Sequence, residues 1–178
     1  QKLSERSRIA TSEGKHKEAL EFAKQAVVAA VEEYGENDLN VVAILETLNR
    51  KLFQLGRHAE AEENVHRIID IMKNLCGEES SRVTDKMSLL AQNYEMQKRW
   101  DDAIAVWEEI IKRQTQEYGN DASKLKFAIT RLESIYIRTG EEDKAKDLDK
   151  RITSMFKEGD HGSELSSYYI HVAQTFRE

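Results

Sequence analysis

Apolar side chains recur along this chain at three- and four-residue intervals and not in strict alternation. That spacing forms one stripe of an α-helix and differs from the two-residue period of a β-strand. Apolar positions also return every 42 residues: Leu45, Met87 and Ile129; Leu48, Leu90 and Leu132; Leu52, Tyr94 and Tyr136; Ala26, Ile68, Ile110 and Ile152. A long internal period predicts stacked structural repeats whose shared faces form the core.

Two recurring breaks divide each repeat into a pair of helices. The first break holds Gly14, Gly56, Lys98 and Gly140, followed five residues later by Ala19, Ala61, Ala103 and Ala145. The second break holds Tyr34-Gly35, Cys76-Gly77 and Tyr118-Gly119, and Asn, Asp or Ser residues follow it. A glycine past a helix end permits left-handed backbone, a small alanine lets two helices approach closely, and Asn, Asp or Ser caps the next helix. Each repeat is therefore predicted to be a helix A, a tight turn, a helix B and a loop.

The breaks set the expected bounds of the helices. Helix A is predicted at about 40–55, 80–97 and 121–139, and helix B at about 15–33, 57–75, 100–117 and 141–157. The helix A before Gly14 is expected to be truncated or frayed. A terminal helix over 163–177 is predicted either to begin a fifth repeat or to fold back into the groove. We expect residues 1–178 to form a single domain, with repeats at about 1–38, 39–80, 81–122 and 123–160.

The repeat resembles the tetratricopeptide repeat (TPR), whose signature places a large residue, Leu, a small residue and Tyr in helix A, then Gly, then Ala in helix B. The third repeat supplies Met87, Leu90, Ala91, Tyr94 and Ala103. The usual TPR period is about 34 residues, and the longer period with a Tyr-Gly loop resembles the variant in kinesin light chains. The resemblance implies an all-α fold, a right-handed α–α superhelix of about four helical hairpins plus a C-terminal helix.

Several positions depart from the TPR pattern. Arg6 replaces the helix A leucine of the first repeat, which suggests that this helix is peripheral or exposed. Asn49 and Glu133 replace the small residue, and the proline that the family places after helix B is missing. The fourth repeat is the least regular.

Composition and charge argue against a nucleic-acid-binding protein and against a membrane protein. The chain has no proline, 34% charged residues and a formal net charge of −6, so it is a poor general binder of nucleic-acid backbones. One cysteine, Cys76, fits a reducing compartment, and the longest apolar run, 26–31, is far short of a membrane span. We therefore expect a cytoplasmic protein. Because it begins at Gln1, we interpret it as a fragment of a longer protein.

No residue pattern indicates catalysis. His16 and His58 share one repeat position, and Cys76 takes the place of Tyr34 and Tyr118, so structural roles are favoured over a metal or thiol site. The sequence contains no phosphate loop, dinucleotide fingerprint or nucleophile elbow. We predict no enzymatic activity, no metal and no cofactor.

The resemblance implies that helix A lines a concave groove that binds a partner protein or peptide. The candidate contact residues at the family's groove positions are Arg8, Glu46, Arg50, Phe53, Gln54, Gln92, Glu95, Met96, Phe127, Ile137 and Arg138. Arg50 and Arg138 suit carboxylates on the partner. Phe53 and Phe127 fit two roles equally: anchors for apolar side chains of the partner, or packing on a neighbouring helix.

Two known binding chemistries of the family are not reproduced. The clamp for chaperone tails uses Lys and Asn, but its positions hold Ser4, Arg8, Thr47, Asp85 and Leu89. The Asn-Asn pair of kinesin light chains is also missing. The expected function is a protein–protein interaction scaffold or adaptor. The alternatives are a regulatory or ligand-sensing arm of a larger signalling protein or enzyme, and a self-association module.

Overall fold

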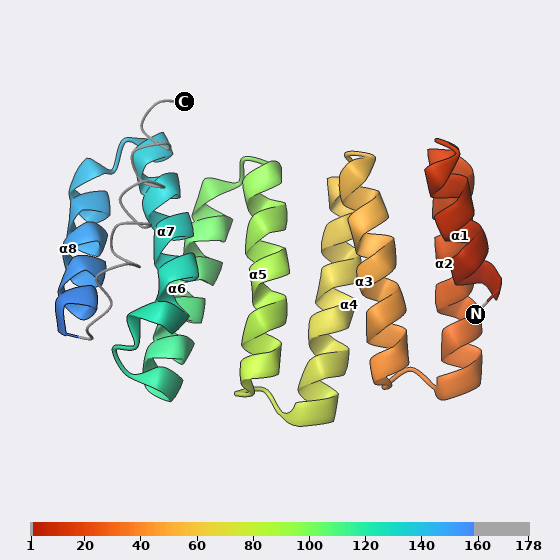
Figure 1. The fold of residues 1–178 in the computed structure, drawn as a ribbon, viewed down its shortest axis with the longest axis horizontal. Coiled ribbons are helices and arrows are strands. Elements are labelled where there is room, and N and C mark those ends of the chain that lie inside the picture. The colour runs from red at the N-terminus through yellow and green to blue at the C-terminus, as the bar shows by residue number, and fades with distance from the viewer. Residues whose placement is uncertain (1, 159–178) are drawn as a thin grey trace. The chain divides into compact units, whose positions relative to one another are not determined.

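The computed structural model describes residues 2–158, so the helix predicted over 163–177 lies outside the described residues. Within 2–158 the chain forms α-helices and no strand: α1 Lys2–Ser12, α2 His16–Tyr34, α3 Leu39–Gln54, α4 His58–Cys76, α5 Ser81–Met96, α6 Trp100–Tyr118, α7 Ala122–Thr139 and α8 Glu142–Glu158 (Figure 1). Helices α2 to α8 begin and end within one residue of their predicted bounds. The first helix A, expected to be truncated or frayed, is a regular helix of 11 residues.

Contacts divide the chain into two compact units, Gln1–Gln97 and Lys98–Glu178. In the N-terminal unit, helices α1 to α5 pack in sequence order, each against the next. In the C-terminal unit, α7 packs against both α6 and α8. The single domain expected over 1–178 stays a prediction.

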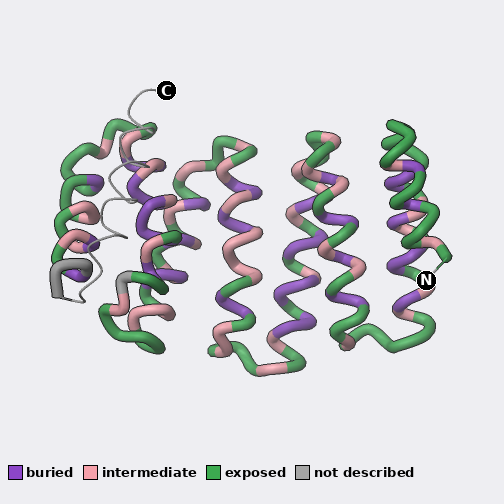
Figure 2. Tube along the Cα trace, viewed as in Figure 1, coloured by how far each residue is buried: buried purple, intermediate pink, exposed green. Residues whose placement is uncertain are grey.

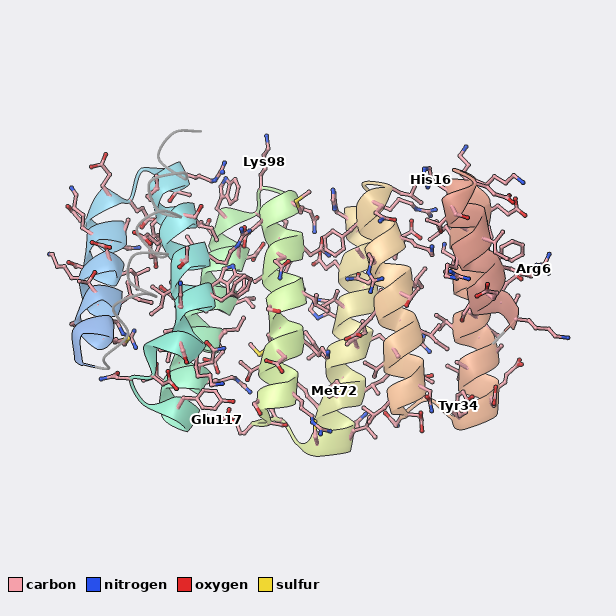
Figure 3. The ribbon with its side chains drawn as sticks, in the orientation of Figure 1. Arg6, His16, Tyr34, Met72, Lys98 and Glu117 are labelled. Carbon is pink, nitrogen blue, oxygen red and sulfur yellow. The ribbon has the colours of Figure 1, made fainter. Side chains whose placement is uncertain are left out.

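The glycines of the first break have the left-handed backbone that the sequence predicts. Gly56 has φ +68° and Gly140 has φ +80°. After each, an amide donates back to a carbonyl in the last turn: Arg57 N to Leu52 O at 2.9 Å and Glu141 N to Tyr136 O at 2.8 Å. These bonds satisfy carbonyls that a helix end would leave open. Lys98 adopts the same region with φ +58°, although it has a side chain, and its side chain points away from the helices (Figure 3).

The second break ends each helix B and caps the next helix A. Asp38, Ser80 and Asp121 each accept a hydrogen bond from the backbone amide two residues later. These three residues lie just before α3, α5 and α7, where a side-chain oxygen can satisfy an amide at the helix N-terminus. The predicted capping role is confirmed.

The predicted core positions are buried within their own units, as the buried stripes of the helices in Figure 2 show. The repeated alanines Ala19, Ala61, Ala103 and Ala145 are all buried. Met87 is the exception among the 42-residue sets, because it is half-buried. It lies on α5, the last helix of the N-terminal unit, which packs within that unit against α4.

The small-residue position of helix A is filled in different ways in the first two repeats. Ser7 is buried and donates from Oγ to the carbonyl of Ala19 at 2.7 Å, which ties α1 to α2. Asn49 is 3% exposed, and its buried Oδ1 has no hydrogen-bond partner among the described residues. Asn49 and Glu133, the two polar departures at the small-residue position, are therefore both buried.

Candidate functional site

A pocket of about 520 Å³ lies between α1 and α3, and three predicted contact residues, Arg8, Arg50 and Gln54, line it. We call it the α1–α3 pocket, and its full lining is Ser4, Ser7, Arg8, Thr11, Ser12, Thr47, Arg50, Lys51 and Gln54. On each helix these residues follow one another at three- and four-residue spacing, so they share one face. The structure thus brings the helix A faces of the first two repeats to one hollow.

Hydrogen bonds fix the wall of this pocket. The Lys51 ammonium donates to Thr11 Oγ1 at 2.5 Å, across from α3 to α1. Thr11 in turn donates to the carbonyl of Ser7 at 2.8 Å. The lysine is therefore held against α1 and does not extend freely into water.

The described lining of the α1–α3 pocket contains cations and neutral polar groups but no Asp or Glu. Arg8 forms an ion pair with Glu5, 2.6 Å apart, and both side chains are largely exposed. Arg50 and Lys51 form no ion pair with any carboxylate in the described part of the chain. Burial, and then the neighbouring Arg50 guanidinium, lower the pKa of the Lys51 ammonium.

The other candidates of the N-terminal unit lie outside this pocket. Glu46 forms an ion pair with Lys86 of α5, with Oε1 and Nζ 2.6 Å apart. The half-buried Phe53 ring meets the His58 ring edge-on, with centroids 5.9 Å apart, which favours the packing role. Gln92 and Glu95 are half-buried, and Met96 is 59% exposed near the end of α5.

The candidates of the C-terminal unit lie on α7. Phe127 is 58% exposed, yet its ring meets the buried Trp107 ring edge-on with centroids 5.7 Å apart. One edge of Phe127 therefore packs while most of the residue faces solvent. This is compatible with both predicted roles, packing on a neighbouring helix and anchoring a partner. Ile137 is half-buried and Arg138 is exposed.

Sequence reasoning missed Lys51, although a signal for it exists. In the other repeats its position holds Ile9, Asn93 and Ile135. Asn93 and Ile135 are buried and Ile9 is exposed, so in two of the three other repeats this position belongs to the core. A cation where the period predicts a buried residue would have identified it.

A second hollow, of about 590 Å³, was not anticipated. This α6–α8 pocket is lined by Glu108, Ile111, Lys112, Thr115, Gln116, Leu132, Tyr136, Lys144, Asp147, Leu148 and Arg151. Its residues come mainly from helix B positions that the sequence suggested were a solvated face. The Tyr136 hydroxyl donates to Glu108 Oε1 at 2.7 Å, and burial followed by this bond raises the pKa of Tyr136.

Several charges around the α6–α8 pocket form ion pairs with a residue three positions away in the sequence. Lys112 pairs with Glu109 at 3.1 Å, Lys144 pairs with Glu141, and Asp147 pairs with Lys150 at 3.1 Å. Arg151 donates to Thr115 Oγ1 at 3.0 Å. The floor of the pocket is apolar, formed by Ile111, Leu132 and Leu148.

Outside these pockets, the residues singled out earlier have structural surroundings. Cys76 is half-buried, and its Sγ donates to the carbonyl of Met72 at 2.9 Å. Arg6 is exposed as predicted and stacks 4.3 Å over the Phe22 ring, on the outer side of α1 (Figure 3). Among residues 2–158 no group of three or more His, Cys, Asp or Glu is placed to hold a metal ion. None of the described helices is long and apolar enough to cross a membrane.

Comparison with solved structures decides the fold. BtubC of P. vanneervenii aligns with a TM-score of 0.72 and 22% identity over 89% of this chain, which spans 63% of that protein. A Podosopora anserina protein described as a kinesin light chain with nearly identical TPR-like repeats aligns at a TM-score of 0.71 and 18% identity, over 97% of this chain and 86% of that one. The chain has a TPR-like repeat fold.

A third solved structure, MamA, resembles this chain less strongly. MamA aligns with a TM-score of 0.56 and 16% identity, over 97% of this chain and 89% of that one. No protein-family model and no curated protein matches the sequence. The predicted all-α class and TPR-like solenoid architecture are confirmed.

Proposed function

We propose that this chain is a protein–protein interaction scaffold that binds a segment of a partner protein along its helix A face, without catalysing a reaction. The α1–α3 pocket carries this proposal, because it joins the helix A faces of two successive repeats in one hollow. A pocket of about 520 Å³ is large enough for one or two side chains of a partner. Its cations and hydroxyls give it a chemistry that recognises a specific group, since charge-assisted hydrogen bonds are directional.

Exposed apolar side chains also lie on a helix A of each unit, outside the pocket. Met96 on α5 and Phe127 on α7 each expose more than half of their surface. Exposed, partly packed apolar groups are typical anchors at protein interfaces. We propose that they contact the same class of partner, in a cytoplasmic setting.

A peptide-display selection on the whole chain tests the function. Random dodecapeptides are selected for binding to residues 1–178 and then rescreened against Arg50→Glu. Arg82→Glu is the matched control, because Arg82 is an exposed arginine of the same unit that does not line the pocket. We expect enriched peptides that lose binding to Arg50→Glu and keep it with Arg82→Glu. Enriched peptides that bind both variants equally would place the interaction elsewhere.

The two other functions predict different outcomes. A self-association module gives a sedimentation coefficient that rises with protein concentration. A ligand-sensing arm yields no enriched peptide, while small organic molecules raise its melting temperature. A monomer that enriches peptides supports the scaffold.

A further inference from the structure

The α1–α3 pocket concentrates positive charge in a chain whose net charge is −6. Arg8, Arg50 and Lys51 reach it, and none of the described lining residues is acidic. Every lining side chain carries a polar or charged group, although carbon atoms make up most of the exposed surface of the lining. A ligand group that fits this hollow is small, polar and negatively charged.

Arg50 and Lys51 lack the ion pair that most other cations of the N-terminal unit form. Ion pairs with nearby acids hold most of its other cations: Lys15 with Glu13, Lys24 and Arg57 with Glu60, Arg67 with Glu36, Lys73 with Glu78, and Lys86 with Glu46. Adjacent cations without a counter-ion repel one another, and the lowered pKa of Lys51 reflects that repulsion together with burial. An anion placed between them relieves the repulsion.

A contact with α5 explains why Arg50 stays unpaired. Glu46 precedes Arg50 by four residues, the spacing at which ion pairs form along a helix. Its carboxylate instead pairs with Lys86 of α5 at 2.6 Å. Because Glu46 is paired with Lys86, it does not pair with Arg50 in the pocket.

The donors in the pocket suit the tetrahedral oxygens of a phosphate. Arginine binds phosphate through two parallel N–H donors, and a phosphorylated side chain carries about −1.5 to −2 charges at pH 7. The ammonium of Lys51 is already oriented by Thr11. The Ser4 hydroxyl and the Gln54 amide line the same hollow and form no hydrogen bond within the described residues. A carboxylate has a single charge and compensates fewer of these groups.

We propose that the α1–α3 pocket binds the phosphate of a phosphorylated serine or threonine in the partner segment, a site that rests on the proposed function above. Arg50 and Lys51 bind the phosphate oxygens, and Arg8, which pairs with Glu5 on α1, lines the same pocket. Phosphorylation of the partner then switches the interaction on. Binding falls as salt concentration rises, because the attraction is electrostatic and the pocket is open to solvent.

Three capped, fluorescein-labelled pentapeptides test this site against the whole chain. They share the sequence Gly-Ala-X-Ala-Gly, where X is phosphoserine, glutamate or serine, and binding is followed by fluorescence polarisation. We expect the phosphoserine peptide to bind at least about tenfold more tightly than the glutamate peptide, and the serine peptide not to bind. Inorganic phosphate displaces the phosphoserine peptide at a concentration where chloride of equal ionic strength does not.

Matched variants locate the binding. Arg50→Gln and Lys51→Gln each weaken binding of the phosphoserine peptide, whereas Arg82→Gln, which removes the same charge outside the pocket, leaves it within about twofold. Arg50 is exposed, so its variant keeps the fold, and melting curves by circular dichroism verify this.

The outcomes separate the phosphate proposal from the general function. Equal affinity for the glutamate and phosphoserine peptides overturns phosphate recognition. An equal loss with Arg82→Gln overturns the site, because it shows diffuse attraction. No binding of the phosphoserine peptide also overturns it. In each case the display selection still decides whether the helix A face binds partner segments without phosphate.

Discussion

The α1–α3 pocket and the α6–α8 pocket have similar volumes but different charge chemistry. Around the α6–α8 pocket, lysines and an aspartate pair with residues three positions away in the sequence. In the α1–α3 pocket, Arg50 and Lys51 have no such partner in the described chain. A charged side chain beside a hollow is available to a ligand when its own helix does not already neutralise it. This difference is why we propose recognition at the first two repeats and a structural role for the polar groups of the other pocket.

The largest expected effect is the loss of peptide affinity when a charge of the α1–α3 pocket is reversed. The same reversal in the α6–α8 pocket serves as the control. Arg50→Glu places a carboxylate where the phosphate binds, and we expect roughly a hundredfold loss of affinity for the phosphoserine peptide. Arg151→Glu in the α6–α8 pocket leaves that affinity within about twofold. Fluorescence polarisation measures both variants, and equal losses would remove the distinction between the pockets.

The next largest expected effect is on the free energy of unfolding, through a hydrogen bond in the α6–α8 pocket. Tyr136 is 3% exposed, and its hydroxyl donates to Glu108. Tyr136→Phe removes this bond, and we expect the free energy of unfolding to fall by about 1–2 kcal/mol. Ser4→Ala in the α1–α3 pocket changes it by less than about 0.5 kcal/mol, because Ser4 is exposed. Urea unfolding measures both variants, and an unchanged stability of Tyr136→Phe would contradict the structural role.

The pH dependence gives an internal check on Tyr136. Its pKa is raised in the folded chain, so the folded state keeps the phenol proton where the unfolded state has lost it. The stabilisation is full below the unfolded value of about 10 and is lost as pH rises through the higher folded value. The difference between the wild-type chain and Tyr136→Phe is therefore expected to shrink between about pH 9 and pH 11. Urea unfolding at both pH values measures it, and a constant difference would show that Tyr136 does not titrate as described.

A smaller effect tests how Arg50 is kept unpaired. Lys86→Gln releases Glu46, which then pairs with Arg50 four residues away and weakens phosphoserine-peptide binding by about three- to tenfold. Lys86 does not line the pocket, so direct contact with the peptide is not involved. The double variant Glu46→Gln with Lys86→Gln is expected to restore affinity. A Lys86→Gln chain that binds normally would rule out this arrangement.

The smallest effect compares the turns of the two units. Gly14 and Gly56 occupy the left-handed turn in the N-terminal unit, whereas Lys98, at the start of the C-terminal unit, has φ +58°. A side chain is strained in this region, so Lys98→Gly is expected to raise the free energy of unfolding by about 0.5–1 kcal/mol. Thermal unfolding measures the change, and a destabilised variant would show that the lysine side chain contributes more than its backbone strain removes.

The repeat period predicted the helices well because helix bounds depend on local features. Glycine at a left-handed turn and Asp38, Ser80 or Asp121 at the helix N-terminus act within a few residues, so their positions reveal the ends directly. The buried alanines follow equally from the period, because each copy holds the same position in its repeat.

The pockets could not be predicted in the same way because they depend on contacts between repeats. Arg8, Arg50 and Gln54 were identified by position, but their meeting in one hollow requires the packing of α1 beside α3. The choice of Glu46 between Arg50 on its own helix and Lys86 on α5 is not encoded in any local pattern. The α6–α8 pocket was missed because charged residues on helix B have the periodicity of a solvated face.

The most direct test of the α1–α3 pocket is a titration of the 15N-labelled chain with the phosphoserine peptide, followed by amide chemical shifts. We predict saturable shifts concentrated on α1 and α3, at and beside Arg8, Arg50 and Lys51, with residues of the α6–α8 pocket unaffected. Arg50→Gln abolishes these shifts and Arg82→Gln preserves them. Shifts spread over both units, or confined to the α6–α8 pocket, would contradict the assignment of recognition to the first two repeats.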